Sequence, residues 1–232
     1  MKLAIMQPYF LPYIGYFQLI NAVDKFIILD DVNYINRGWI NRNNILVDGK
    51  KHLFTIPLED ASQNKRINEI RISSENKWQQ KFLKTTELNY KKAPHFTNVF
   101  PLIEEIITKA EEKISVFNYH SIVKVCDYIG IKTEIVPESG RYQNTEMKGQ
   151  ARIVDICLKE QASVYINSIG GAELYSKEQF RNNNLDLYLL NSKNVAYQQF
   201  GKEFVPALSL IDVMMFNSPE NIGYLLKQYE LV

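Results

Sequence analysis

Residues 3–29 read LAIMQPYFLPYIGYFQLINAVDKFIIL and contain two short apolar runs separated by a helical pattern. The first run, residues 3–6, ends at Gln7 and Pro8, and the second run covers residues 25–29. Between them, residues 14–22 repeat apolar side chains at the spacing of one helix face. A strand, a short helix and a second strand in this order are typical of a parallel sheet, so the segment predicts an α/β fold.

The rest of the chain continues this alternation. Asp48-Gly49 separates residues 44–47 from residues 52–56 and predicts an inserted β-hairpin. Further strands are expected at residues 133–136, 164–166 and 186–190, and helices at residues 77–89, 99–109, 116–129, 149–160, 175–180, 207–216 and 219–229. We therefore predict a Rossmann-like, mostly parallel sheet flanked by helices, with an inserted β-hairpin and helical additions, in a single domain of residues 1–232.

The composition favours a soluble cytoplasmic protein. With 27 basic and 26 acidic side chains the net charge is +1, so nucleic acid is not an expected partner. No stretch approaches the roughly 18 consecutive apolar residues of a membrane helix, and Gln7-Pro8 interrupts the N-terminal apolar run too early for a signal peptide. Cys126 and Cys157 lie in amphipathic patterns, which is typical of free core thiols. The sequence does not indicate an oligomeric state.

Three polar or glycine-rich segments follow predicted strands directly. They are residues 7–16, residues 30–43 and residues 167–171. Ligands of open α/β sheets collect beyond the carboxyl ends of the parallel strands, so we expect these segments to meet in one site. In particular, Gln7, Tyr9, Asp31 and Gly171 are expected to line one pocket. A polar loop at residues 138–148 is a candidate cover for it.

Several side chains of these segments have a functional and a structural interpretation. Asp30-Asp31 would act as a general base or hold a cation, or would be solvated or helix-capping carboxylates. Arg37 and Arg42 bracket Trp39 and would hold a diphosphate, or form surface ion pairs. Gly170-Gly171 would approach an anion, or serve a turn. His95, after Pro94, is a candidate loop base. No metal-ligand spacing is present, so neither a metal nor another cofactor is expected.

Several sequence blocks resemble the WbqC-like family. They read QPYFLPYIGY at residues 7–16, DDVNY at 30–34, GWINRN at 38–43, LNY at 88–90 and FVPALSLID at 204–212, together with Ser168 and Gly170-Gly171. These blocks occur in order from one end of the chain to the other, so the resemblance covers nearly all of it.

The resemblance implies a role in surface polysaccharide or O-antigen biosynthesis. Some WbqC-like proteins are thought to attach an acyl group such as glycyl to the amine of a nucleotide-linked aminodeoxysugar. The expected partners are then a nucleotide sugar and an acyl donor, with Asp31 or His95 as the base. The expected substrate-binding residues are Gln7, Tyr9, Tyr13, Tyr16, Asp30, Arg37, Trp39, Asn41, Arg42, Ser168, Gly170 and Gly171.

A more distant resemblance leaves two alternatives open. Tyr13-Ile14-Gly15-Tyr16 occupies the place where nucleotidyltransferases carry a His-x-Gly-His signature between strand and helix. A phenol carries no positive charge near neutral pH, so the tyrosines do not replace those histidines at a phosphate. The alternatives are a nucleotidyltransferase, which would release pyrophosphate from a triphosphate, and a non-catalytic nucleotide-sugar binding module, which would bind without turnover.

Overall fold

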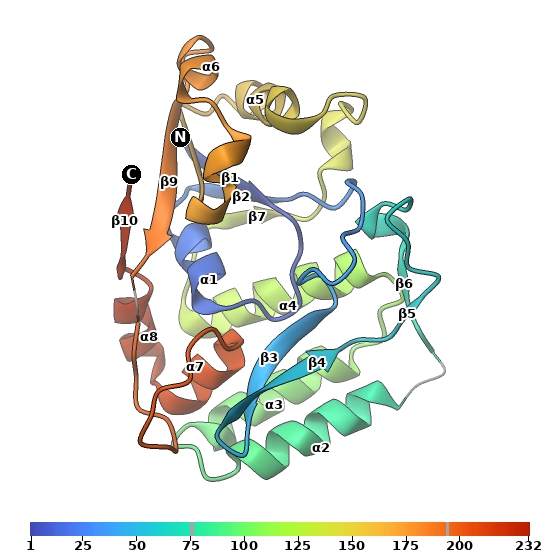
Figure 1. Ribbon diagram of the computed structural model, residues 1–232, viewed down its shortest axis with the longest axis vertical. Coiled ribbons are helices and arrows are strands. Elements are labelled where there is room, and N and C mark those ends of the chain that lie inside the picture. Colours follow the sequence, from blue (N-terminus) through green and yellow to red (C-terminus); the bar gives the residue numbers. More distant parts are fainter. Residues whose placement is uncertain (75–76, 194) are drawn as a thin grey trace.

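The computed structural model describes residues 1–74, 77–193 and 195–232 of the chain (Figure 1). Six of the strands in these ranges form one sheet in the order β10-β9-β8-β1-β2-β7. Along the chain they are β1 (Lys2–Met6), β2 (Lys25–Ile28), β7 (Glu134–Val136), β8 (Val164–Ser168), β9 (Asp186–Ser192) and β10 (Tyr229–Leu231). All neighbouring pairs from β7 to β9 are parallel, and β10 runs antiparallel to β9.

The strand order confirms the predicted Rossmann-like architecture. If the six strands of this sheet are numbered 1 to 6 along the chain, their order from β7 to β10 is 3-2-1-4-5-6. This is the strand order of doubly wound dinucleotide-binding sheets. The order reverses between β1 and β8, which pair through Lys2 with Val164 and Leu3 with Tyr165. Ligands of such sheets bind beside this reversal, so it marks the place to search for a site.

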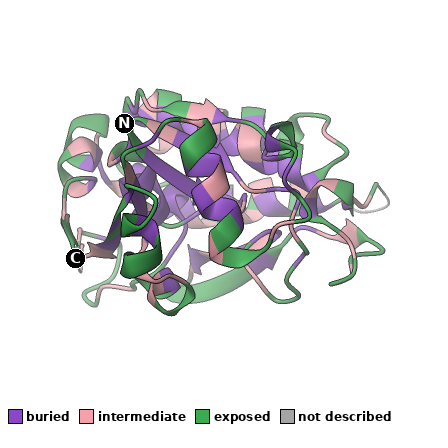
Figure 2. Cartoon of the chain, turned by 90° about the horizontal axis from the view of Figure 1, so that it is seen from above, coloured by how far each residue is buried: buried purple, intermediate pink, exposed green. Residues whose placement is uncertain are grey.

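Helices cover both faces of the sheet. The described α-helices are α1 (Ile14–Asn21), α2 (Trp78–Tyr90), α3 (Phe96–Thr108), α4 (Ile114–Ile129), α5 (Gly149–Lys159), α6 (Lys177–Arg181), α7 (Leu210–Phe216) and α8 (Pro219–Leu225). Figure 1 shows α5 and α6 on one side of the sheet and α1, α4 and α8 on the other. The central strands β1, β2 and β8 are mostly buried, while the outward residues of covering helices such as α5 and α6 are exposed (Figure 2).

Two hydrophobic clusters hold these layers together. Leu3 and Ile5 of β1 pack into the cluster that contains Ile153 of α5, whereas Ala4 packs into the larger cluster with Phe17 of α1. Successive side chains of a strand point to opposite faces, so a strand covered by helices on both sides is apolar at every position. This is why residues 3–6 form an uninterrupted apolar run.

The predicted hairpin is present as β3 (Arg42–Val47) and β4 (Lys50–Thr55). Asp48 and Gly49 have φ values of 50° and 73°, the left-handed pair that a two-residue hairpin turn requires. β3 begins two residues earlier than predicted, because Arg42 and Asn43 pair with Thr55 and Phe54. A second small pair, β5 (Leu58–Glu59) with β6 (Arg71–Ile72), was not predicted.

Several predicted boundaries in the C-terminal half are wrong. The helix expected from residue 207 begins at Leu210, because Ala207 has a left-handed φ of 56° and the Ser209 hydroxyl accepts from the Ile211 N–H as an N-cap. The helical turn expected at residues 175–180 is present as α6 but begins two residues later, at Lys177, and it follows an unpredicted 3-10 helix, η3 (Ile169–Leu174). The last helix ends at Leu225, and the chain then adds the unpredicted edge strand β10.

Within the described residues, the helices are all too short or too polar to cross a membrane.

Candidate functional site

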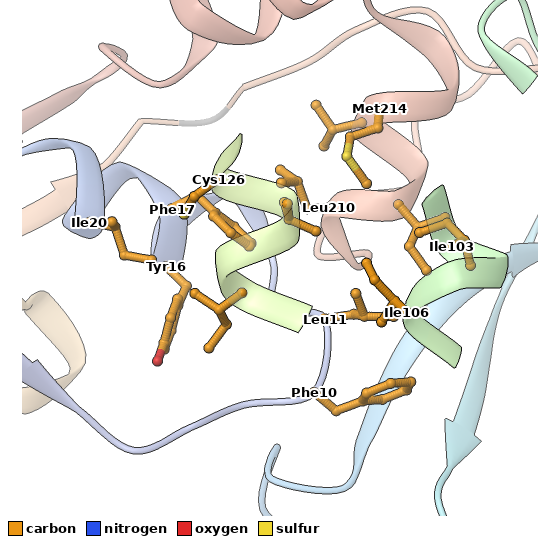
Figure 3. Close-up of a cluster of buried hydrophobic side chains, with 14 of the residues drawn as sticks. Phe10, Leu11, Tyr16, Phe17, Ile20, Ile103, Ile106, Cys126, Leu210 and Met214 are labelled. Carbon is orange, nitrogen blue, oxygen red and sulfur yellow. The ribbon is translucent and has the colours of Figure 1, made fainter. Parts of the chain in front are cut away.

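The loop from Gln7 to Tyr13 is anchored by its middle residues. Phe10 and Leu11 are buried in the larger cluster among side chains of α3, α4 and α7 (Figure 3). The Asn43 side-chain amide donates to the carbonyls of both residues at 3.0 and 2.6 Å. Because the apolar residues of the loop point into the core, the aromatic residues on either side of them, Tyr9 and Tyr13, are left at the surface of a cavity.

This cavity, here called the aromatic cavity, has a volume of about 420 Å³ and lies at the reversal between β1 and β8. Aromatic rings and polar groups share its wall. The rings belong to Tyr9, Tyr13, Tyr16, Trp39 and Tyr175, and the polar or small residues are Gln7, Asn167, Ser168, Gly170 and Gly171. Rings with neighbouring hydrogen-bonding groups suit a ligand with flat or ring-shaped parts and polar edges.

A second cavity of about 570 Å³ adjoins the first, and we call it the cationic cavity. The two cavities share the lining residues Gln7, Leu29, Leu174 and Tyr175, so they are joined along these side chains. Arg66, Lys148, Arg152 and Asp31 are the charged residues that line the cationic cavity in the described part of the chain. Its remaining wall includes the first residues of α5.

Asp31 and Arg152 form a buried ion pair in this wall. The Arg152 Nη2 donates to both Asp31 carboxylate oxygens, at 2.6 and 2.7 Å, and the two side chains are 6% and 2% exposed. The Ser139 hydroxyl also donates to Asp31 Oδ1, and the Arg152 Nε donates to Asn144 Oδ1 at 3.0 Å. Among described donors, Asp31 Oδ2 therefore accepts only from Arg152, which leaves one of its acceptor positions without a donor.

The tyrosines of the aromatic cavity are hydrogen-bonding and stacking groups rather than charges. Burial raises the pKa of Tyr9, Tyr13 and Tyr175 above the ordinary phenol value. It raises the pKa of Tyr16 further, and the Tyr16 hydroxyl donates to the Gln7 carbonyl at 2.9 Å. All four are neutral phenols near neutral pH, and Tyr16 also holds the start of the loop.

Most of the predicted site residues meet as expected. Those that line the aromatic cavity are Gln7, Tyr9, Tyr13, Tyr16, Trp39, Ser168, Gly170 and Gly171. Asp31 lines the cationic cavity, which Gln7 also reaches. The single pocket expected for Gln7, Tyr9, Asp31 and Gly171 is thus divided into two joined cavities. The roles of these residues remain predictions.

Five predicted residues line neither cavity: Asp30, Arg37, Asn41, Arg42 and His95. The Arg42 Nε donates to the Gly38 carbonyl at 2.9 Å, and its guanidinium lies over the Trp39 ring, 5.8 Å from its centre. Arg42 therefore supports Trp39 from outside the cavity. Arg37 is exposed in a left-handed turn with φ 61°.

The other three have contacts that explain their positions. Asn41 is buried and accepts from the Tyr34 hydroxyl while donating to the Ile56 carbonyl. His95 precedes α3, and its backbone N–H donates to the Met215 carbonyl, among helices away from both cavities. Asp30 accepts from the Ser139 backbone N–H at 3.0 Å, and burial raises the pKa of its carboxyl.

The sequence interpretation missed Arg66, Ser139, Lys148, Arg152 and Tyr175. Ser139 and Lys148 belong to the loop at residues 138–148 that the sequence marked as a candidate cover, so a partial signal existed. Arg152 lies inside a helical pattern, where an arginine usually faces solvent. Only its pairing with Asp31, 121 residues away, shows that it is buried.

The described residues contain no cluster of metal ligands, and their cysteine thiols lie outside both cavities. No cluster of three or more His, Cys, Asp or Glu side chains gathers there as a metal site would require. Cys126 and Cys157 are free and buried, as predicted, and burial raises the pKa of both thiols, that of Cys157 to about 12. Neither cysteine lines the two cavities.

The sheet order and the joined cavities define a Rossmann-like α/β protein with its candidate ligand site at the strand reversal. The WbqC-like protein family matches residues 7–224, so the chain belongs to this family, which confirms the resemblance seen in the sequence. The chain is also similar to the uncharacterized protein Rv1507c of Mycobacterium tuberculosis (strain ATCC 25618 / H37Rv), with 27% identity over 227 residues, 97% of each chain. No solved structure matches the chain significantly.

Proposed function

We propose that this protein is a transferase of surface polysaccharide or O-antigen biosynthesis that attaches an acyl group, such as glycyl, to the amine of a nucleotide-linked aminodeoxysugar. The acyl-transfer part rests on what the family resemblance implies. The observation that supports a nucleotide-linked substrate is the pair of joined cavities at the strand reversal, one aromatic and one cationic. A nucleotide sugar has the matching parts, a flat base and a charged diphosphate with its sugar.

In this proposal the aromatic cavity receives the nucleoside. Tyr9, Tyr13 and Trp39 offer ring faces on which a base stacks, and stacking on a protein ring contributes about 1–3 kcal/mol per base. Gln7 and Ser168 line the same cavity and offer hydrogen bonds to base or ribose edges.

The aminosugar then occupies the cationic cavity, where Asp31 is the carboxylate among the described lining residues. In the reaction, the amine nitrogen forms a bond to the acyl carbon, the leaving group of the donor takes its electron pair, and the nitrogen loses a proton. A protonated amine is not nucleophilic, so a nearby acceptor helps this step. Oδ2 of Asp31 has an acceptor position for the amine, and Arg152 keeps the carboxylate in place. Asp31 is therefore proposed as the base in preference to His95.

The direct test combines binding with turnover. A panel of nucleotide sugars, with and without an amine on the sugar, is screened by thermal shift against the full chain. Each ligand that binds is then incubated with activated acyl donors, and the product is examined by mass spectrometry. The proposal predicts a product heavier by one acyl group, formed only from the amino sugars. Binding of nucleotide sugars without any acylated product would instead favour the binding module.

A first prediction tests the aromatic cavity through Trp39. Its side chain is 44% exposed, so Trp39→Ala removes a stacking face with little effect on folding. Loss of about 1–3 kcal/mol of stacking raises the Kd for the nucleotide sugar about 5- to 150-fold. Tyr224→Ala on α8 is the matched control, because Tyr224 is 68% exposed and lines neither cavity. Equal affinities of both variants and wild type, measured by calorimetry, would contradict stacking on Trp39.

A further inference from the structure

The cationic cavity contains more positive charge than the protein itself neutralises. Three cationic side chains and one carboxylate line it, a surplus of two positive charges among the described residues. Arg152 is paired with Asp31, whereas Arg66 and Lys148 form no ion pair with any carboxylate in the described part of the chain. Two unpaired cations on the wall of one cavity favour an anionic ligand with more than one charge.

The first turn of α5 adds hydrogen-bond donors to the same wall. Lys148, Gly149 and Gln150 line the cavity, and no side chain caps the start of this 11-residue helix. Gly149 has a left-handed φ of 53°, a conformation that favours glycine, and a Cβ built on it would meet no atom within 4 Å. The N–H groups of a helix start have no acceptor within the helix and attract anions. The space beside Gly149 is therefore open to such an anion.

Arg152 supplies an independent sign of a ligand. It is 5% exposed and lines the cavity, with Nε held by Asn144 and Nη2 held by Asp31. Its Nη1 has no hydrogen-bond partner among the described residues. A buried guanidinium that is fixed on two sides and lacks a partner on the third is preorganised to bind an oxyanion.

The start of α1, the helix that follows the first strand, does not offer the open space for an anion that the start of α5 offers. In doubly wound folds the phosphates usually bind at the glycine-rich turn into this helix. Here the Tyr13 ring covers the first turn of α1, since a Cβ on Gly15 would lie 2.4 Å from Tyr13 Cε2. The glycine of this turn makes room for an aromatic ring rather than for a phosphate.

We infer that the cationic cavity binds the diphosphate of the substrate at the start of α5, with Arg152 as the buried donor and Arg66 and Lys148 as the outer ones. This inference rests on the proposed function and deepens it. The diphosphate lies between the nucleoside in the aromatic cavity and the sugar beside Asp31. In this inference, Arg66, Lys148 and Arg152 take the diphosphate-binding role that the sequence suggested for Arg37 and Arg42, which line neither cavity.

The test uses inorganic pyrophosphate as the probe, with binding to the full chain measured by calorimetry. Arg66→Ala and Lys148→Ala are each expected to raise the Kd at least about tenfold, because each removes a charge-assisted contact. Lys132→Ala is the matched control, since it removes the same charge from an exposed position before β7, at the opposite end of the strands. It should leave the Kd unchanged. Thermal unfolding verifies that all variants fold.

The outcomes separate this inference from the proposed function. No pyrophosphate binding by the wild type, or equal losses in Lys132→Ala and Lys148→Ala, would overturn the diphosphate site even if amino sugars are acylated. Pyrophosphate binding that Lys148→Ala weakens would support the site even if no acylated product forms, and the proposed function alone would then fail.

Discussion

Asp212 is a buried carboxylate that hydrogen-bond donors surround. It accepts from the Tyr90 hydroxyl at 2.9 Å, the Tyr197 hydroxyl at 2.7 Å and Gln199 Nε2 at 2.7 Å, and it forms no ion pair within the described residues. Through Asp212, these contacts join α7 to Tyr90 at the end of α2 and to the segment that precedes α7. Burial has the largest effect on the Asp212 pKa and raises it above the ordinary 3.8, although the three donors lower it.

This gives a pH prediction for Asp212→Asn. The folded protein takes up a proton on Asp212 between the raised pKa and 3.8, while the unfolded chain does not. The unfolding free energy of the wild type, relative to the variant, therefore rises as the pH falls through this window. Urea denaturation of both proteins from about pH 7 to about pH 4 measures the difference. A relative stability that decreases with falling pH would mean that the donors outweigh burial.

α4 positions the loop of the candidate site as well as filling the core. Asn118 of this helix is buried, and its Nδ2 donates to the carbonyls of Pro8 at 3.0 Å and Ile40 at 2.7 Å. One side chain thus links the helix to the loop that follows β1 and to the segment before β3. Since Pro8 directly precedes Tyr9, this link holds the backbone next to a ring of the aromatic cavity.

We expect Asn118→Ala to lower the unfolding free energy by about 1–3 kcal/mol, because two buried carbonyls lose a donor. Asn98→Ala is the control, since Asn98 is exposed on α3 and should change stability by no more than about 0.5 kcal/mol. Urea denaturation compares the two variants. Equal stabilities would show that the loop is held without Asn118.

The sheet as a whole joins segments that lie far apart in the sequence. β1 and β8 are neighbours, so Gln7 and Ser168 line one cavity although 160 residues separate them. The crevice at this reversal is where a doubly wound sheet binds nucleotides, but the fold alone does not select the reaction. The chemistry of the lining residues has to distinguish the transferase from the nucleotidyltransferase.

We predict no pyrophosphate release from common nucleoside triphosphates, with or without magnesium. Tyr13 and Tyr16 are neutral phenols, and the Tyr16 hydroxyl is already bound to the Gln7 carbonyl. In a nucleotidyltransferase, the two signature histidines would stabilise charge on the phosphates. Loss of this electrostatic stabilisation costs about 10²–10³ in rate per group. Tyr13→His with Tyr16→His should not create this activity, because both positions line the aromatic cavity and not the cationic cavity proposed for the diphosphate. A pyrophosphate-release assay with sugar phosphates checks this, and robust wild-type turnover would favour the nucleotidyltransferase.

Much of the fold was predictable because it is encoded locally. Apolar runs such as residues 3–6 and 25–29 mark strands buried on both faces, and Asp48-Gly49 marks a hairpin turn, whatever lies around them. The polar segments that follow those strands identified the candidate site, since carboxyl ends of parallel strands share one edge. The sequence therefore predicted the architecture and most of the aromatic cavity.

The cationic cavity and the edge strand β10 depended on contacts between distant residues. A helical pattern shows which face of α5 is apolar. It does not show that Arg152 contacts Asp31, a residue that follows β2 and lies 121 positions earlier in the chain. Arg66, Lys148 and Arg152 come from separate segments, and no spacing along the chain relates them. β10 has three residues and exists because β9 offers it an open edge. Periodicity reports burial along one element, whereas pairing across elements is settled only when the whole core assembles.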